Sequence, residues 1–149
     1  LANAQEATRF DGVAFAAPIQ ADATAIDRVF AGVLANAPEP PVKFILYFES
    51  GTPTLTAASL ALLDEIAAAA AARGSRDVAI SGHADRPGAD AANLDLSLRR
   101  AQTVATALTA RGGAAETVEQ TSHGEGNPLI PTADDVAEPR NRRVEVVIR

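Results

Sequence analysis

Four short segments with strand patterns, separated by two long helical segments, most limit how this chain can fold. Pro41 precedes the first strand segment, and Gly74 and Gly112 follow the two helical patterns. The expected strands occupy residues 42–48, 77–81, 116–122 and 144–149. The resulting order, β-α-β-α-β-β, predicts an α/β (α+β) sandwich in which one mixed sheet is backed by two main helices.

Both helical segments carry an apolar face. Thr56 is placed to cap the first helix, with Leu55 and Leu60 as a hydrophobic staple. The apolar stripe expected on this helix consists of Leu60, Leu63, Ile66 and Ala70. The second helix is expected over residues 93–111, and its sheet-facing side is expected to hold Leu94, Leu98, Ala101, Ala105 and Leu108. Arg99 then points into solvent, whereas Arg100 lies on the flank, from which its guanidinium is expected to reach water.

The first 41 residues differ in character from the rest of the chain. They form a mixed polar stretch with a short helix expected near residues 22–35, followed by the proline cluster PEPP at 38–41. Such a cluster breaks helices and marks a joint. We therefore expect an N-terminal arm or linker over residues 1–41 and one folded domain over residues 42–149.

Composition argues against several classes of function. The formal net charge of −6 argues against general binding of nucleic acid, which usually needs a basic surface. The absence of Cys excludes disulfides and thiol chemistry, and no run of about 18 apolar residues is present to span a membrane. Because the sequence contains no Met, Leu1 is expected to be a processing boundary, with any signal peptide, lipid anchor or membrane helix upstream of it.

The segment GHADRPG at residues 82–88 contains an acid that a glycine turn does not require. Asp85 follows the carboxyl end of the second strand, where open α/β sheets usually bind ligands, and a helix N-terminus follows. Arg100 lies on that helix, and Arg142 is placed to flank the same crevice. An acid and an arginine together suit a zwitterion, because the acid takes an ammonium and the guanidinium clamps a carboxylate.

Other interpretations of these residues stay open on this reasoning. In a purely structural one, Asp85 pairs with Arg100 or Arg86 and binds nothing. His83 and His123 each lie two residues from an acid, but such pairs arise by chance, so we expect no metal site. No GxSxG motif and no recognisable glycosidase pair of carboxylates is present, so we expect neither enzymatic activity nor a cofactor.

These motifs together resemble those of a known family. GHADRPG followed by NLDLSLRRAQTVATAL is similar to the signature of the OmpA-like C-terminal domain, G-H-T-D-x-x-G and then N-x-x-L-S-x-x-R-A-x-x-V-x-x-x-L. YFESGTPTLT upstream, and SHGEGNPLIP and EPRNRRVEVVIR downstream, resemble the remaining motifs in the same order, so the resemblance spans residues 42–149. This family includes peptidoglycan-associated lipoproteins and the periplasmic domains of flagellar stator proteins.

The resemblance implies non-covalent binding of peptidoglycan through the diaminopimelate of its stem peptide, whose side-chain end carries an ammonium and a carboxylate. Asp85 and Arg100 match the acid and the arginine of the two main motifs, and Arg142 matches a third contact. Asn93 matches the motif asparagine, expected to shape the loop and the helix start. Ala84 replaces the usual Thr, and Gly51 occupies a position that is often polar, so both departures bear on affinity.

The function implied is that of a periplasmic domain that tethers the outer membrane, or an envelope assembly, to the cell wall. Its anchor would precede Leu1, its partner is peptidoglycan, and its oligomeric state stays open. The alternative is a protein–protein interaction domain on the same fold that has lost wall binding and uses the arm at 1–41 or the loop at 126–140.

Overall fold

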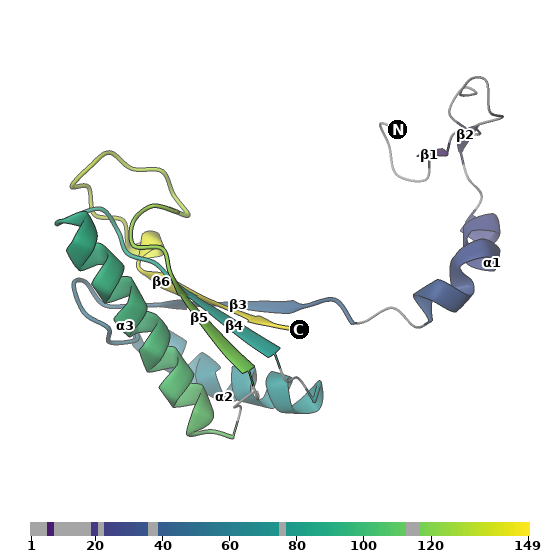
Figure 1. The fold of residues 1–149 in the computed structure, drawn as a ribbon, viewed down its shortest axis with the longest axis horizontal. Coiled ribbons are helices and arrows are strands. Elements are labelled where there is room, and N and C mark those ends of the chain that lie inside the picture. Colours follow the sequence, from purple (N-terminus) through teal and green to yellow (C-terminus); the bar gives the residue numbers. More distant parts are fainter. Residues whose placement is uncertain (1–5, 8–18, 21–22, 36–38, 75–76, 113–116) are drawn as a thin grey trace. The chain divides into compact units, whose positions relative to one another are not determined.

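The computed structural model describes residues 6–7, 19–20, 23–35, 39–74, 77–112 and 117–149. The chain divides into two compact units, Leu1–Glu39 and Pro40–Arg149. In the first unit, strand β1 (Glu6–Ala7) pairs antiparallel with β2 (Ile19–Gln20), and helix α1 (Ala23–Leu34) follows. The second unit contains a larger sheet and two long helices (Figure 1).

The sheet of the second unit has four strands in the order β3-β6-β4-β5. The strands are β3 (Val42–Tyr47), β4 (Asp77–Gly82), β5 (Thr117–Ser122) and β6 (Arg143–Ile148). β6 runs antiparallel to both β3 and β4, whereas β4 and β5 are parallel. Helix α2 (Ala57–Ala72) connects β3 to β4, and helix α3 (Asp90–Thr109) connects β4 to β5. The predicted order and the mixed sheet are confirmed.

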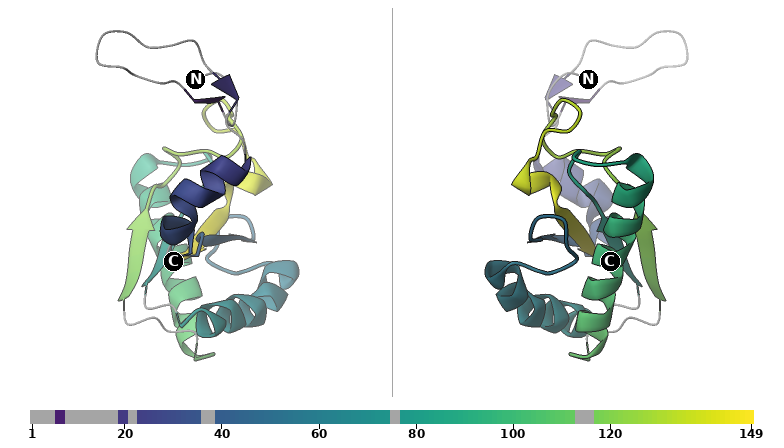
Figure 2. Two further views of the ribbon diagram at one scale, coloured as in Figure 1. Left: turned by 90° about the vertical axis from the view of Figure 1, so that its right-hand side faces the viewer. Right: turned by 90° about the vertical axis from the view of Figure 1, so that its left-hand side faces the viewer.

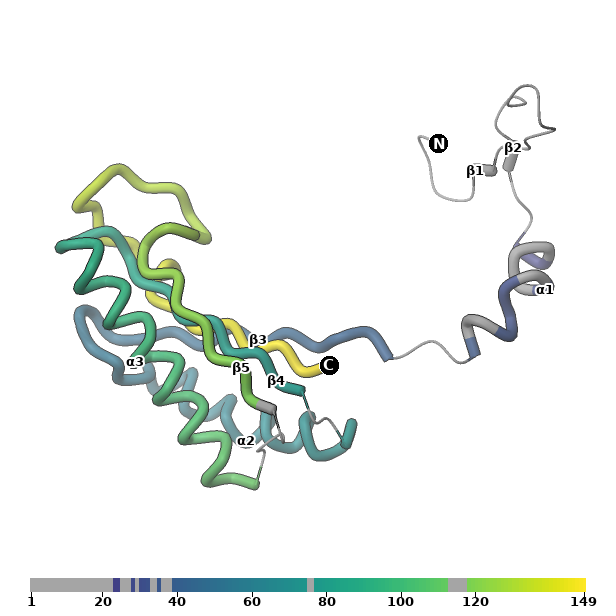
Figure 3. Tube along the Cα trace, viewed as in Figure 1, coloured from purple at the N-terminus to yellow at the C-terminus, as the bar shows by residue number. Residues whose placement is uncertain are grey.

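Helices α2 and α3 pack against each other and against the sheet, and they lie on the same side of it (Figures 1 to 3). Strand residues that alternate toward the helices are buried, among them Leu46, Val78, Ile80, Val144, Val146 and Ile148. They form one apolar core with Leu63 and Ile66 of α2 and with Val104 and Leu108 of α3. None of the described helices is long and apolar enough to cross a membrane.

Helix α2 starts and stops where the sequence predicts. The Thr56 hydroxyl accepts a hydrogen bond from the Ser59 backbone N–H at 3.3 Å, and Gly74 adopts a φ of 57° just beyond the helix. The buried stripe begins at Ser59 rather than at Leu60, which is 48% exposed. The Ser59 hydroxyl accepts a hydrogen bond from the Tyr47 backbone N–H at 2.8 Å, which turns Ser59 toward β3. The expectation that Leu60 belongs to the buried stripe is therefore wrong.

Helix α3 buries only part of the face expected: Ala101, Ala105 and Leu108 are buried as predicted. Leu94 and Leu98 are 50% and 37% exposed, so their predicted place on the sheet is wrong. The buried residues of α3 are Asn93, Leu96, Ser97, Arg100, Ala101, Val104, Ala105 and Leu108. Three of them are polar and recur at helical spacing, which shows that a polar row, not only an apolar one, faces the rest of the domain.

Gly82 explains how closely α3 approaches the sheet. A Cβ placed on Gly82 would lie 1.9 Å from the backbone carbonyl oxygen of Ser97. Only glycine permits this contact, so the end of β4 lies directly beneath the middle of α3. The residues that follow β4 are thereby brought to the same end of the domain as Arg100.

Candidate functional site

Asp85 lies in the segment that continues β4. The backbone N–H of His83 donates to the Arg143 carbonyl at 2.9 Å, and that of Ala84 donates to the Gly124 carbonyl at 2.7 Å, so this segment is held before it turns toward α3. Asp85 is 7% exposed, and its Oδ2 accepts a hydrogen bond from Nη1 of Arg142 at 3.0 Å. Among the two arginines expected as structural partners, Arg86 instead pairs with Asp134 at 2.6 Å.

Arg100 is fully buried, with 0% of its surface exposed. Its guanidinium donates to three backbone carbonyls: Nε to Thr52 at 3.1 Å, Nη1 to His83 at 2.9 Å and Nη2 to Glu49 at 3.3 Å. The guanidinium also stacks on the Phe48 ring, with its central carbon 5.3 Å from the ring centroid. The expectation that Arg100 reaches water from the flank of the helix is therefore wrong for this structure, because these segments cover it.

Burial also affects the charge of Arg100. Desolvation lowers the pKa of Arg100 to about 10, nearby Asp85 raises it, and nearby Arg142 lowers it. With that pKa the guanidinium keeps its positive charge at neutral pH. Arg100 bonds to the carbonyl of His83, two residues before Asp85. It also lies over Phe48, whose carbonyl faces Nε of Arg142. The three side chains therefore form one charged group, although Asp85 hydrogen-bonds to Arg142 and not to Arg100.

Arg142 joins the site from the start of β6, which lies beside the end of β4 because the two strands are antiparallel. It lies between the short 3-10 helix η1 (Pro139–Asn141) and β6, and its Nε points to the Phe48 carbonyl at 3.4 Å. The Arg142 carbonyl in turn accepts the Phe48 backbone N–H at 3.0 Å. The Arg142 side chain is 13% exposed and that of Asp85 is 9% exposed, so this ion pair is the part of the group nearest to solvent.

The other three predicted site residues shape the surroundings. Asn93 is 5% exposed, and its Nδ2 donates to the Pro87 carbonyl at 3.2 Å and to Glu125 Oε2 at 2.6 Å. Gly51 is exposed at a φ of 66° in the loop that covers Arg100. Ala84 is 2% exposed, so its methyl group faces the interior.

Two buried residues of the N-R-R motif have structural roles that the sequence analysis missed. Asn141 is 0% exposed, and its side chain bonds the backbone N–H and carbonyl of Ile130 at 2.9 and 2.8 Å. Arg143 is 2% exposed and donates to Glu145 Oε1 at 2.8 Å and to the Asn127 carbonyl at 3.3 Å. Both residues hold the long segment before η1. The feature of the sequence that could have revealed these roles is their position on either side of Arg142.

His83 and His123 stack with ring centroids 4.9 Å apart. Burial, together with the nearby charge of Arg143, lowers the pKa of His83 to about 4, so the ring is neutral at physiological pH. Within the described ranges, no three His, Cys, Asp or Glu side chains are grouped so that they would hold a metal ion.

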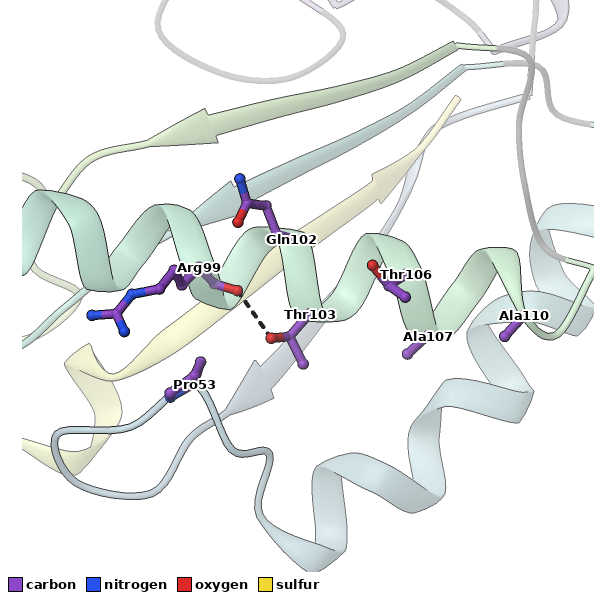
Figure 4. Close-up of a pocket in the computed structure, with 7 residues that line it drawn as sticks. All are labelled: Pro53, Arg99, Gln102, Thr103, Thr106, Ala107 and Ala110. Atoms are coloured by element: carbon purple, nitrogen blue, oxygen red, sulfur yellow. Dashed lines mark hydrogen bonds between the residues drawn. The ribbon is translucent and has the colours of Figure 1, made fainter.

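A separate groove of about 510 Å³ runs along the solvent side of α3 (Figure 4). Its lining residues are Pro53, Arg99, Gln102, Thr103, Thr106, Ala107 and Ala110. Arg99 is exposed, as predicted, and pairs with Asp95 one turn earlier at 2.8 Å. Pro53 belongs to the loop that covers Arg100, so this loop has the groove on one side and the charged group on the other.

Comparison with known proteins identifies relatives of this domain. An outer membrane protein of Gluconacetobacter diazotrophicus is 30% identical over 118 residues, which are 75% of this chain and 31% of that protein. A peptidoglycan-binding protein, ArfA, of Mycobacterium tuberculosis is 38% identical over 71 residues, which are 48% of this chain and 22% of that protein. The match thus spans about a third of the length of the first relative and less than a quarter of the second.

Solved structures show the same fold. The peptidoglycan-associated lipoprotein of Burkholderia pseudomallei superimposes with a TM-score of 0.64 at 28% identity, covering 70% of this chain and 89% of that one. The C-terminal domain of MotB from Helicobacter pylori gives a TM-score of 0.61 at 24% identity, covering 71% and 84%. The OmpA family matches residues 47–142, which confirms the resemblance inferred from the motifs. The chain belongs to the OmpA family.

Proposed function

We propose that residues 42–149 form a domain that binds peptidoglycan non-covalently through the diaminopimelate of its stem peptide. The observation that carries the proposal is the grouping of Asp85, Arg100 and Arg142 at one end of the sheet. One carboxylate beside two guanidiniums suits a ligand end that bears both an ammonium and a carboxylate. Relatives named as a peptidoglycan-binding protein and a peptidoglycan-associated lipoprotein support the same choice of ligand.

Each charged residue has a distinct role in this proposal. Arg142 contacts Oδ2 of Asp85, so we assign Oδ1 to the ammonium of the ligand. Arg100 takes the ligand carboxylate, since its own donors are directed only at backbone carbonyls. Arg142 then contributes a second positive charge beside the carboxylate and keeps Asp85 in position.

The two departures from the family pattern weaken single contacts only. Ala84 supplies no hydroxyl, and Gly51 supplies only backbone groups. Loss of one neutral hydrogen bond costs about 0.5–1.5 kcal/mol, whereas loss of a charged partner in a desolvated contact costs about 2–5 kcal/mol. Since all three charged residues are present, binding is retained.

The setting of the domain follows from this ligand. We place it in the periplasm, where it tethers the outer membrane or an envelope assembly to the cell wall. Residues 1–41 serve as an arm or linker, and the anchor lies in a segment upstream of Leu1. The named relatives include outer membrane proteins, which supports that setting.

The test is retention on purified peptidoglycan of the diaminopimelate type. Asp85→Asn removes the charge and keeps the side-chain size, and Arg142→Gln replaces the guanidinium with a shorter, uncharged polar group; each is expected to reduce the retained fraction at least about tenfold. Asp64→Asn and Arg99→Gln are the controls, because both residues are exposed and lie in ion pairs that do not involve the site. Unchanged retention of both site variants would show the assignment to be wrong.

A second candidate is a protein–protein interaction domain that has lost wall binding. The observation that favours it is the pair of exposed apolar side chains Leu129 and Val136 in the long segment before η1, at 41% and 46% exposure. Titration with a soluble muropeptide, followed by NMR, separates the two candidates. Shifts confined to residues 49–53, 84–93 and 140–143 support wall binding, whereas no shift in these residues supports the interaction domain.

A further inference from the structure

The guanidinium of Arg100 is covered on the edge that a carboxylate prefers. Nε and Nη2 form that edge, and they donate to the carbonyls of Thr52 and Glu49 at 3.1 and 3.3 Å. A carboxylate usually binds arginine through two parallel hydrogen bonds to this same pair of nitrogens. With Arg100 0% exposed, a ligand carboxylate reaches it only if a covering segment moves.

Two of the covering segments are fixed by the sheet. The carbonyl of His83 accepts from Nη1 of Arg100, and the His83 N–H is bonded to the Arg143 carbonyl at 2.9 Å. Phe48, beneath the guanidinium, is bonded through its N–H to the Arg142 carbonyl at 3.0 Å. Movement of either segment would break pairing at the end of the sheet.

The third covering segment, residues 49–54, is held more weakly, and we call it the strap. Its internal bonds are Glu49 N–H to the Thr54 carbonyl at 2.9 Å, Thr52 N–H to the Glu49 carbonyl at 3.5 Å and Thr54 N–H to Thr52 Oγ1 at 3.3 Å. The last two are long for hydrogen bonds. Gly51, at a φ of 66°, gives the strap a turn with no side chain. The strap begins and ends at Phe48 and Leu55, which are buried and pair with each other.

We propose that the strap moves off Arg100 when a carboxylate ligand binds, with Phe48 and Leu55 as its fixed ends. This inference rests on the proposed function and adds the step by which the site opens. The ligand carboxylate replaces the carbonyls of Glu49 and Thr52 on Nε and Nη2, while the bond from Nη1 to His83 is kept. The apparent affinity is then the intrinsic affinity reduced by the fraction of molecules with the strap open.

A reversible cross-link tests the proposal, because the chain contains no Cys of its own. Pro53 of the strap and Thr103 of α3 line the same groove (Figure 4), so the double variant Pro53→Cys, Thr103→Cys places one thiol on each side. Oxidation, or bridging with a short bis-maleimide, then holds the strap to α3. Binding of a soluble muropeptide that contains meso-diaminopimelate is measured for the parent, the reduced variant and the bridged variant.

We expect the bridged variant to bind at least about tenfold more weakly than the same variant in its reduced form. A second measurement does not depend on the cross-link. In the parent, the carbonyl carbon resonances of Glu49 and Thr52 are expected to shift on addition of the muropeptide, because they lose their bonds to Arg100, whereas that of His83 keeps its position.

The outcomes separate the two proposals. If the parent does not bind the muropeptide, the proposed function fails, and the opening step fails with it. If the parent binds while the Glu49 and Thr52 carbonyl resonances stay in place and the bridged variant binds equally well, the strap proposal is overturned and the proposed function stands. If no bridge forms, the carbonyl resonances alone decide.

Discussion

Two groups of charged side chains lie at the same end of the sheet, and they are built differently. The ligand cluster consists of Asp85, Arg100 and Arg142, and the sheet cluster consists of Lys43, His83, Arg143 and Glu145. In the sheet cluster, Glu145 accepts directly from Lys43 and Arg143. In the ligand cluster, Arg100 bonds only to backbone carbonyls.

The difference separates structure from binding within single motifs. Arg142 and Arg143 are direct neighbours, yet they belong to different clusters because successive residues point in opposite directions where β6 begins. His83 and Asp85 also belong to different clusters, although both lie in the segment that follows β4. A buried cation that is paired with a carboxylate already has its counter-ion, whereas Arg100, held only by carbonyl dipoles, keeps a positive charge that an anion can balance once the covering segment moves. We therefore expect changes in the sheet cluster to affect stability without affecting binding, and changes in the Asp85–Arg142 pair to affect binding.

The largest effect on stability is expected from Arg100. Arg100→Met removes three hydrogen bonds to backbone carbonyls, one of them the buried carbonyl of His83, so the free energy of unfolding should fall by roughly 2–4 kcal/mol. Arg99→Met on the same helix is the control, expected to change it by less than about 0.5 kcal/mol. Urea denaturation measures both, and equal effects of the two substitutions would contradict the burial described for Arg100.

A pH dependence is expected from His83. Its pKa is lowered to about 4 in the folded chain, so the unfolded chain binds more protons between that value and the ordinary 6.5. Stability should therefore fall as the pH drops below the ordinary value, by about 3 kcal/mol once the pH is below both values. Thermal unfolding of His83→Phe, which keeps a ring against His123, should show a flatter profile over this interval. A profile as steep as that of the parent would assign the dependence to other groups.

Glu145→Gln tests the sheet cluster. Burial raises the pKa of Glu145, but hydrogen bonds and charge from Lys43 and Arg143 outweigh it and lower that pKa overall, so the carboxylate is ionised at neutral pH. Its neutralisation should cost about 1–3 kcal/mol of stability, because the cations lose their partner. Peptidoglycan retention by the folded fraction should be unchanged. A parallel loss of retention would mean that the two clusters do not act separately.

Asp85→Asn should have the smallest effect on stability. Its ion pair with Arg142 is the part of the ligand cluster nearest to solvent, and Asn keeps an oxygen that can accept from Arg142, so the expected loss is about 1–2 kcal/mol. Chemical denaturation checks this value beside the retention experiment. A loss larger than that of Glu145→Gln would make Asp85 primarily a structural residue.

The fold was predictable because its signals are local. Strand patterns, the Thr56 cap and the glycine at Gly74 depend on nearby residues, and the bounds of the strands and helices follow them closely. The prediction for α3 was wrong at Leu94 and Leu98, because a helical wheel built on apolar residues alone assumes that arginine stays out of the interior. The partners that make burial of Arg100 acceptable come from Glu49, Thr52 and His83, which are distant in sequence.

The grouping of three charged residues was predictable from the sequence, but their contacts were not, and their role in binding stays a prediction. The motifs pointed to Asp85, Arg100 and Arg142, and the structure groups them. The pairing of Asp85 with Arg142 depends on η1 and β6 returning to the end of β4, a tertiary contact that no spacing reveals. The roles of Asn141 and Arg143 depend on the same return of the chain.

The position of β6 has a consequence for the order of assembly. This strand is the last in sequence, yet it lies in the middle of the sheet between β3 and β4. During synthesis the earlier strands emerge without the neighbour that joins them, so the sheet closes only after residue 148 has left the ribosome. Arg142 immediately precedes this strand, so the group of Asp85, Arg100 and Arg142 is complete only when the last strand is in place.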